Sequence, residues 1–297
     1  MKRFATAMLM LVCAAAGGAH WLDLVNYTDL TTGFVNFGAY WLRYAVLAGV
    51  LVLIGLASLM ITHWSEGLSG CTPVQGLLDF SIGIAFAGLA GLRLYTWQQA
   101  SGVDKALTIL YFVSAVWFFM LGRSKLSFTS QTPSRNALLG IAGTLSLYLL
   151  TVQRFCFNPT GIVRVSNTMG ALAALAALLF CTVQMKTSYL SGQKGSRWLY
   201  FTGMTAFLLC SCIALPGAIC GYMVGKVEMS ALLEASALGM IGLCGLATAF
   251  GAAGGPMPAQ LQQEEAEDAE QPAEENQPAE AERTQEAVAS ETENSAL

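Results

Sequence analysis

The sequence predicts an all-α protein, a polytopic bundle of about eight transmembrane helices followed by a disordered acidic tail. Apolar stretches of about 20 residues, the length that crosses a hydrocarbon core of about 30 Å as a helix, recur along residues 1–254. The composition points the same way, because 55% of the residues are hydrophobic and 11% are charged. Soluble domains carry about 25% charged residues, so a soluble fold is disfavoured.

Eight apolar segments separated by short polar loops are the candidate spans. They are Phe4–Trp21, Tyr40–Thr62, Leu77–Trp97, Ala106–Leu121, Ala137–Gln153, Thr168–Met185, Leu199–Gly225 and Ser230–Phe250. Inside lipid each backbone N–H and C=O must be satisfied within its own segment, so we expect every span to be a helix.

The first span has two interpretations. Lys2 and Arg3 precede an apolar segment that ends in the small residues Ala14–Ala19, a pattern that resembles a cleavable signal peptide. Apolar and aromatic residues continue through Leu22, however, which favours an uncleaved helix. Cleavage would leave seven spans and would not change the orientation of the others.

Tryptophan and tyrosine mark the ends of the spans that follow. Tyr40 and Trp41 begin the second span, Trp97 ends the third, and Trp198 precedes the seventh. Such side chains gather at the two membrane–water interfaces, so these positions indicate where the helices meet the lipid headgroups.

The seventh span combines a proline with glycines at four-residue spacing. The residues are Pro216, Gly217, Gly221 and Gly225. Proline removes a backbone hydrogen bond and kinks a helix, while a glycine stripe lets a second helix approach closely. The stripe predicts helix packing, for which Gly239, Gly242 and Gly245 of the last span are the candidate partners, or a hinge in a moving helix.

Four ionisable side chains inside the spans form the candidate polar site, because charge within a membrane is costly. Arg43 lies near the outer end of the second span, from which its long side chain can extend to the interface. Asp79 lies near the inner end of the third span, where the helix dipole favours a negative charge. Arg93 and Glu234 lie at matching depth near the outer ends of the third and eighth spans. We expect them either to pair and fix helix packing or to line an outward-facing site for a substrate or a proton.

Positive charges in the loops predict the orientation. Residues 1–254 carry 14 Lys or Arg and 7 Asp or Glu, so the membrane part is basic. With the N-terminus inside, the inner loops and termini hold nine Lys or Arg and the outer loops hold four. By the positive-inside rule both termini are expected in the cytoplasm, with the bundle in the cell membrane.

The C-terminal segment differs sharply from the bundle. Residues 255–297 carry 12 Asp or Glu and one Arg, and they contain almost no large apolar side chains. Such a segment cannot bury enough apolar surface to offset the entropy of ordering, so it is predicted to be disordered. Its charge makes it a candidate contact for a basic protein partner.

Motifs that carry catalysis are absent from the sequence. There is no HExxH, GxSxG, GxGD or P-loop pattern. His20 and His63 are predicted at opposite faces of the membrane, and the eight cysteines include no CxxC pair. The basic residues are dispersed over the loops rather than gathered in a patch. We therefore expect no enzymatic activity, no metal or other cofactor and no nucleic-acid binding.

Two classes of function remain for a chain surrounded by the lipid bilayer. Short loops, the breaks in the seventh span and the intramembrane charges favour a transporter or permease-type subunit for a small solute. The alternative is a non-catalytic accessory or scaffold protein that recruits a partner through its acidic tail. The two classes differ in which part carries the function, the intramembrane charges or the tail.

Overall fold

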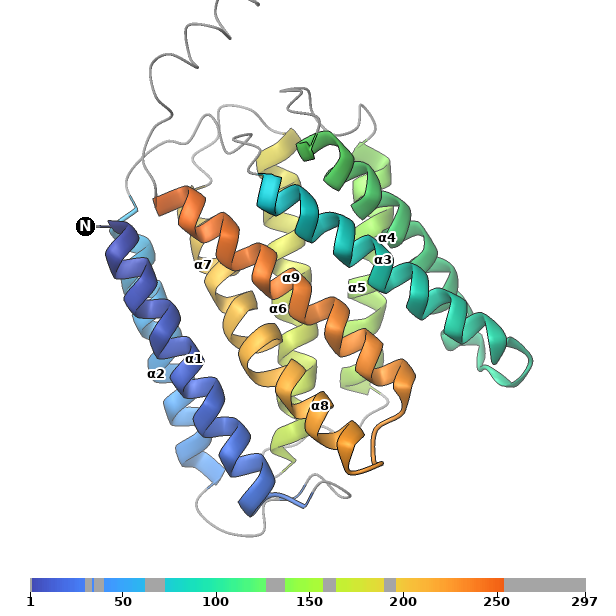
Figure 1. Ribbon diagram of the computed structural model, residues 1–297, viewed down its shortest axis with the longest axis horizontal. Coiled ribbons are helices and arrows are strands. Elements are labelled where there is room, and N and C mark those ends of the chain that lie inside the picture. Colours follow the sequence, from blue (N-terminus) through green and yellow to red (C-terminus); the bar gives the residue numbers. More distant parts are fainter. Residues whose placement is uncertain are drawn as a thin grey trace, which may run out of the picture. The chain divides into compact units, whose positions relative to one another are not determined.

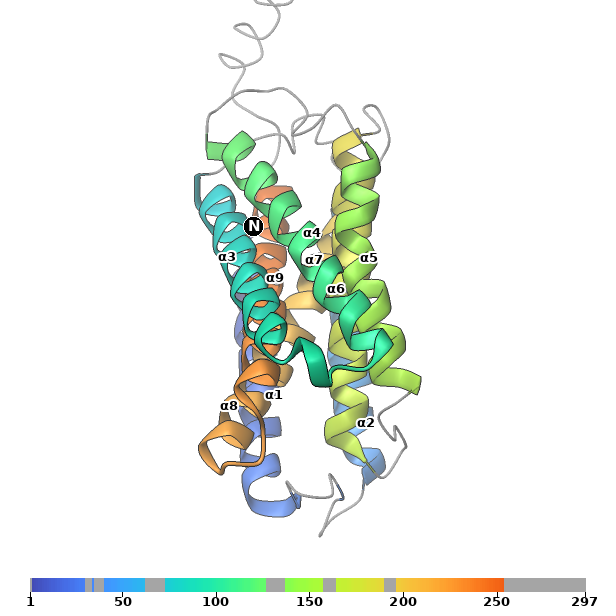
Figure 2. The ribbon, with the colours of Figure 1, turned by 90° about the vertical axis from the view of Figure 1, so that its right-hand side faces the viewer.

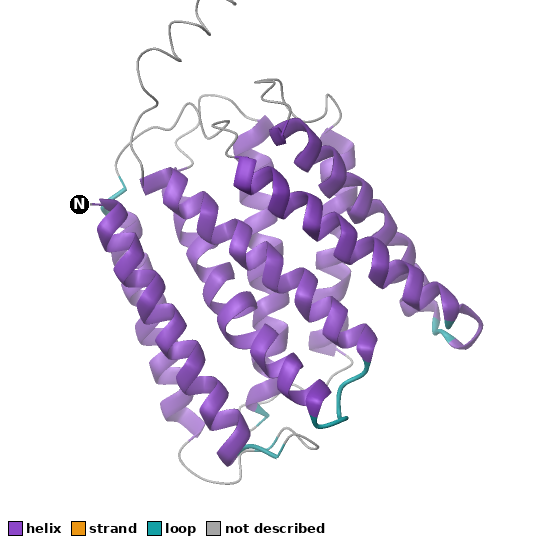
Figure 3. Ribbon diagram, viewed as in Figure 1, coloured by secondary structure: helices purple, strands orange, loops and turns teal. Residues whose placement is uncertain are grey.

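The computed structural model describes residues 2–29, 34, 40–61, 73–126, 137–156, 164–189 and 196–253. The described residues are almost entirely helical and contain no strand (Figure 3). The elements are α1 (Lys2–Tyr27), α2 (Tyr40–Leu59), α3 (Pro73–Tyr95), η1 (Trp97–Gln99), α4 (Gly102–Leu126), α5 (Ala137–Cys156), α6 (Val165–Tyr189), α7 (Ser196–Ala206), η2 (Phe207–Ala214), α8 (Leu215–Met223) and α9 (Met229–Ala253). The predicted all-α fold is confirmed, and the predicted disorder of residues 255–297 concerns a segment outside the described residues.

Eight helices of the described chain are long and apolar enough to cross a membrane, with α7, η2 and α8 together forming one of them. Each overlaps one predicted span, as expected for a multi-pass integral membrane protein. One boundary differs in a way that matters below. Helix α4 begins at Gly102 rather than Ala106, because the Ser101 hydroxyl accepts from the Asp104 amide and caps the first turn, while it donates to the Asp104 carboxylate.

Helix α9 lies at the centre of the bundle (Figures 1 and 2). It packs against α3 on one side and against α7, η2 and α8 on the other. Helix α4 packs on α3 and α5, and α5 on α6, while α1 and α2 form a pair at the edge that contacts α7 and η2. We call the side on which α1 begins and α9 ends the N-terminal side. The distal side is the one on which α1 ends and α9 begins.

The first helix is built into the bundle along its length. The hydroxyl groups of Thr6 and Tyr200 lie 3.2 Å apart, and the Cys13 side chain is fully buried. A Cβ at Gly17 would lie 2.5 Å from the carbonyl oxygen of Cys212, so only glycine allows α1 this close to η2. These contacts join α1 to α7 and η2.

One close helix approach in the described bundle differs from the predicted one. It joins Gly203 of α7 to Gly245 of α9, where a Cβ on either residue would lie within 2.6 Å of the other's carbonyl oxygen. By contrast, a Cβ at Gly217 would make only an ordinary contact with Leu24, and one at Gly221 would meet Val227 in the turn after α8. The predicted glycines of the seventh span therefore do not make this contact. All three glycines of the predicted partner stripe do pack closely on that span, Gly245 at Gly203, Gly242 at Ala206 and Gly239 at Leu215.

Gly225 also lies outside the stripe, because it ends the helix. Its φ angle is +72°, a conformation that favours glycine. The amide of Gly225 donates to the carbonyl of Tyr222, and the amide of Lys226 donates to that of Gly221, both at 2.9 Å. This is the hydrogen-bond pattern of a Schellman motif, which satisfies carbonyls at the end of a helix.

The break predicted at Pro216 takes the form of a π-helix. Residues Phe207–Ala214 adopt this wider winding, and the Leu215 amide donates to the carbonyl of Cys210, five residues earlier. Proline has no N–H to donate and its ring crowds the carbonyl four residues before it, so the wider turn accommodates Pro216 without ending the span. The hydroxyl of Ser211 donates to the carbonyl of Gly239 at 2.7 Å and ties the π-helix to α9.

Candidate functional site

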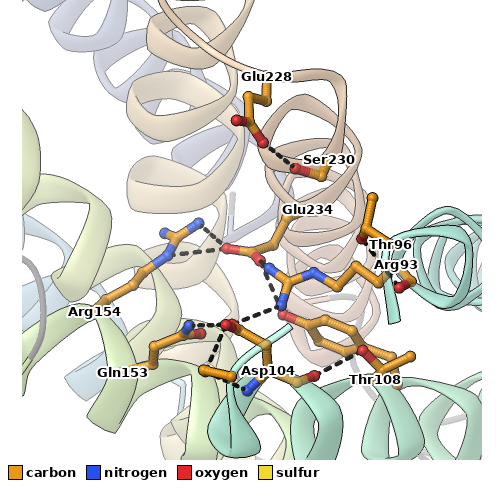
Figure 4. Close-up of polar contacts among 11 residues, drawn as sticks. Arg93, Thr96, Asp104, Thr108, Gln153, Arg154, Glu228, Ser230 and Glu234 are labelled. Atoms are coloured by element: carbon orange, nitrogen blue, oxygen red, sulfur yellow. Dashed lines mark hydrogen bonds and ion pairs between the residues drawn. The ribbon is translucent and has the colours of Figure 1, made fainter. Parts of the chain in front are cut away.

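A buried carboxylate on the distal side is the centre of a polar cluster. Glu234 of α9 is 6% exposed and accepts hydrogen bonds from three side chains (Figure 4). Its Oε1 accepts from Nη2 and Nε of Arg154 at 2.6 and 3.2 Å. Its Oε2 accepts from Nη2 of Arg93 at 3.0 Å and from the hydroxyl of Tyr111 at 2.9 Å. A carboxylate has about four lone-pair positions, so the acceptor capacity of Glu234 is filled.

The helix ends favour the two arginines of the cluster. Arg93 and Arg154 lie in the last turns of α3 and α5, where the helix dipole favours positive charge. Glu234 lies beyond the first turn of α9, so its charge is compensated by the two arginines rather than by the start of the helix. Tyr111 comes from α4 and is fully buried. The cluster therefore joins α3, α4, α5 and α9 at one depth in the bundle.

A second carboxylate extends the cluster towards the surface. Asp104, at the start of α4, accepts from Ser101 at 2.7 Å and from the Gln153 amide at 3.0 Å. Its Oδ1 lies 3.6 Å from Nη1 of Arg93, so this arginine bridges the two carboxylates. The Arg93 guanidinium also lies 5.3 Å from the centre of the Tyr111 ring, a cation–π geometry. Figure 4 shows Arg154 approaching Glu234 from the side opposite to Arg93.

The cluster lines a cavity of about 340 Å³. Its polar wall contains Arg93, Arg154 and Glu234, joined by Gln153, Ser166, Asn167 and His20. Its apolar wall comes from α1, α5 and α6 and from the junction of η2 with α8. Arg93 also lines a second cavity of about 420 Å³ that contains Asp104 and Glu228. The arginine thus stands between a basic cavity and an acidic one.

The structure brings together two of the four predicted site residues, Arg93 and Glu234. Asp79 lies on the N-terminal side, 14 residues before Arg93 on α3, which corresponds to about 21 Å along the helix axis. It was expected as a helix-end charge, but it is fully buried and pairs with Lys125 of α4 at 2.6 Å. Cys244 of α9 also donates to it at 3.3 Å.

Arg43 differs from its predicted role as well. Its side chain is 11% exposed and binds Asp23 of α1 at 2.6 Å instead of extending away from the bundle. This pair joins α1 to α2 beside a smaller cavity of about 180 Å³, which shares His20, Met169 and Ile213 with the 340 Å³ cavity. The predicted first span ends at Trp21 and leaves Asp23 outside, so the sequence pattern does not indicate this pair.

Three members of the cluster were not predicted. Arg154 was counted as a loop charge, yet it lies two residues inside the end of α5. Asp104 was placed before the fourth span, which the cap at Ser101 extends. Tyr111 gave no signal beyond being an aromatic residue in an apolar helix. The position of Arg154 directly after the predicted end of the fifth span at Gln153 was the one signal that the sequence offered.

The cluster holds ionised donors and acceptors rather than metal ligands. Among the described residues, no group of three or more His, Cys, Asp or Glu is arranged to hold a metal ion. Two guanidinium groups and one carboxylate line the 340 Å³ cavity, so the arrangement is suited to binding a charged or polar solute. Comparisons of the chain with protein-family models, with curated proteins and with solved structures give no match.

Proposed function

We propose that this membrane protein transports a small solute and that the 340 Å³ cavity is its solute site. The observation that carries the proposal is the buried cluster of Glu234, Arg93 and Arg154 at the wall of that cavity. Ionisable groups inside a membrane helix are costly, and they commonly mark substrate or ion pathways.

A packing role alone does not require the cavity. An ion cluster that served only to join α3, α5 and α9 could be covered by apolar side chains. Here it borders about 340 Å³ of space that also exposes the polar side chains of Gln153 and Asn167.

The opposite wall of the cavity comes from the irregular part of the seventh span. Ile213 and Ala214 of η2 and Gly217 and Ala218 of α8 line it. Irregular helix geometry at membrane depth is tolerated where it lines a cavity, and discontinuous helices form the solute sites of many transporters. The location of the π-helix and Pro216 beside the cavity supports a wall that moves during transport.

Towards the N-terminal side, the same central helices are held together by a separate buried pair. Asp79 of α3 binds Lys125 of α4, and Cys244 of α9 donates to Asp79. The bundle therefore has a buried ion pair towards its N-terminal side and a cavity on its distal side. This asymmetry is expected of one state of an alternating-access cycle.

Uptake into vesicles with a blocked cavity tests the proposal. Ala231 is exposed and lines the cavity, so Ala231→Trp fills the space without entering the core. The matched control is Ala15→Trp, at an exposed alanine of α1 that lines none of the three cavities described above. Each protein is reconstituted into phosphatidylcholine vesicles and given a labelled carboxylate, amine, amino acid or polyol. Saturable uptake by the wild type and by Ala15→Trp, lost in Ala231→Trp, is the expected result. Uptake of none of these solutes by the folded wild-type protein would contradict the proposal.

A further inference from the structure

The polar wall of the 340 Å³ cavity is rich in hydrogen-bond donors. An arginine carries five N–H groups. Described contacts engage three of those of Arg154, two with Glu234 and one with the Gly170 carbonyl at 2.7 Å. Glu234, the one carboxylate among the described lining residues, already accepts four hydrogen bonds. The charged part of this wall therefore has donors to offer a solute and no acceptor capacity left.

The charge of the wall has the same sign. Two guanidinium groups face one carboxylate, which leaves one positive charge in excess at the cavity. Asp104 offsets part of the charge of Arg93 from the neighbouring cavity, at 3.6 Å. No carboxylate other than Glu234 lies in ion-pair contact with Arg154 among the described residues. Arg154 is thus the arginine on which a further anion would replace Glu234.

The rest of the cavity is suited to an apolar body. Leu24, Leu150, Met169 and Ile213 line it from α1, α5, α6 and η2. An apolar cavity of about 150 Å³ is enough to hold benzene in a protein. A volume of about 340 Å³ therefore accommodates a ring or short chain together with an acidic group.

We infer that the solute is a small organic anion, an acidic group on an apolar body, whose acidic group binds Arg154 in competition with Glu234. The inference rests on the proposed function, because it names the solute class of the same cavity. Binding of the anion replaces part of the Arg154–Glu234 contact and so weakens the connection between α5 and α9. An acidic group on a lipid has the same chemistry, and the experiment below separates the two sources.

Equilibrium binding to the purified full-length protein in maltoside detergent tests the inference, with benzoate as the probe. Benzamide and benzylamine have the same ring with neutral and positive groups, and hexanoate replaces the ring with a chain. We expect saturable binding of benzoate or hexanoate, and binding of benzamide and benzylamine at least about tenfold weaker, since a hydrogen-bonded charge contributes about this factor.

Three substitutions locate the binding group. Arg154→Gln is expected to weaken carboxylate binding about tenfold or more, and Arg154→Lys, which keeps the charge, to weaken it less. Glu234→Gln is expected to strengthen it, because the competing carboxylate is removed. The matched control is Arg43→Gln, which also removes an arginine from a buried ion pair but lies beside the smaller cavity. It is expected to change binding by less than about twofold. Gel filtration and thermal unfolding confirm that each variant is folded.

The outcomes are distinct. The inference would be overturned if benzylamine bound more tightly than benzoate, or if benzamide bound equally well. It would also be overturned if Glu234→Gln lost carboxylate binding while Arg154→Gln kept it, or if neither benzoate nor hexanoate bound saturably. Competition by dihexanoyl-phosphatidylglycerol but not by dihexanoyl-phosphatidylcholine, at concentrations below those of benzoate, supports the anion chemistry and assigns it to a lipid. Carboxylate binding without uptake into vesicles would refute transport and keep the anion site. Saturable uptake of the amine alone would support transport and refute the anion site.

Discussion

A methyl group at Gly203 perturbs a close backbone contact between α7 and α9. A Cβ there would lie 2.5 Å from the carbonyl oxygen of Gly245, whereas a favourable contact needs about 3.5 Å, so α7 and α9 must separate by about 1 Å. Overpacking of this kind costs about 1–3 kcal/mol, and the better helix propensity of alanine returns up to about 1 kcal/mol. With the full return, we expect Gly203→Ala to lower the free energy of unfolding by up to about 2 kcal/mol.

The assay is unfolding of the detergent-solubilised protein in a titration with sodium dodecyl sulfate, followed by tryptophan fluorescence. The control is Gly88→Ala in α3, where a Cβ would meet nothing within 4 Å. That change removes the same residue type from a helix without a clash, so the variant should be as stable as the wild type or up to about 1 kcal/mol more stable. Equal stability of the two variants would show that α7 and α9 do not approach at these glycines.

Three further predictions concern the cluster, the orientation and the tail. Glu234→Gln and Asp79→Asn should each lower the free energy of unfolding, by up to about 3–5 kcal/mol because each leaves a buried basic partner without its carboxylate, measured in the same titration. Cys156, exposed at the distal end of α5, should react in intact cells with a maleimide that cannot cross the membrane. If labelling appears only after the cells are opened, and is lost in Cys156→Ser, the predicted orientation is reversed. Deleting residues 256–297 should leave the free energy of unfolding of the bundle unchanged. It should also remove any protein that co-purifies through the acidic tail, and an unchanged set of co-purifying proteins would argue against a scaffold role.

The helices were predictable because their length and apolar character are set by local sequence. The matching depth of Arg93 and Glu234 followed from the same spans and placed two members of the cluster correctly. Arg154 directly follows the predicted end of the fifth span, and it was assigned to a loop because apolarity alone marks the end of a span. The cap formed by Ser101 and Asp104 likewise extends α4 through polar residues that an apolar pattern leaves out.

The face on which a glycine lies was not predictable for the seventh span. A regular helix keeps residues four apart on one face, whereas the π-helix Phe207–Ala214 winds more residues into each turn. Everything after it is therefore rotated relative to α7, so that Gly203 faces α9 while Gly217 faces Leu24 of α1. A proline in the sequence indicates a break, but the type of break depends on tertiary contacts such as Ser211 with Gly239.

The two buried carboxylates of the described helices separate a packing role from a solute role. Glu234 and Asp79 each bind a basic side chain and each lie in the central helices, but only Glu234 borders the 340 Å³ cavity. If both serve packing, uptake by Glu234→Gln and Asp79→Asn should fall in proportion to the stability that each variant loses. If Glu234 competes with an anionic solute, its amide variant should bind the solute more tightly despite its lower stability, whereas Asp79→Asn should bind as the wild type does. A loss of stability cannot by itself raise an affinity, so tighter binding in Glu234→Gln alone would assign Glu234 to the solute site.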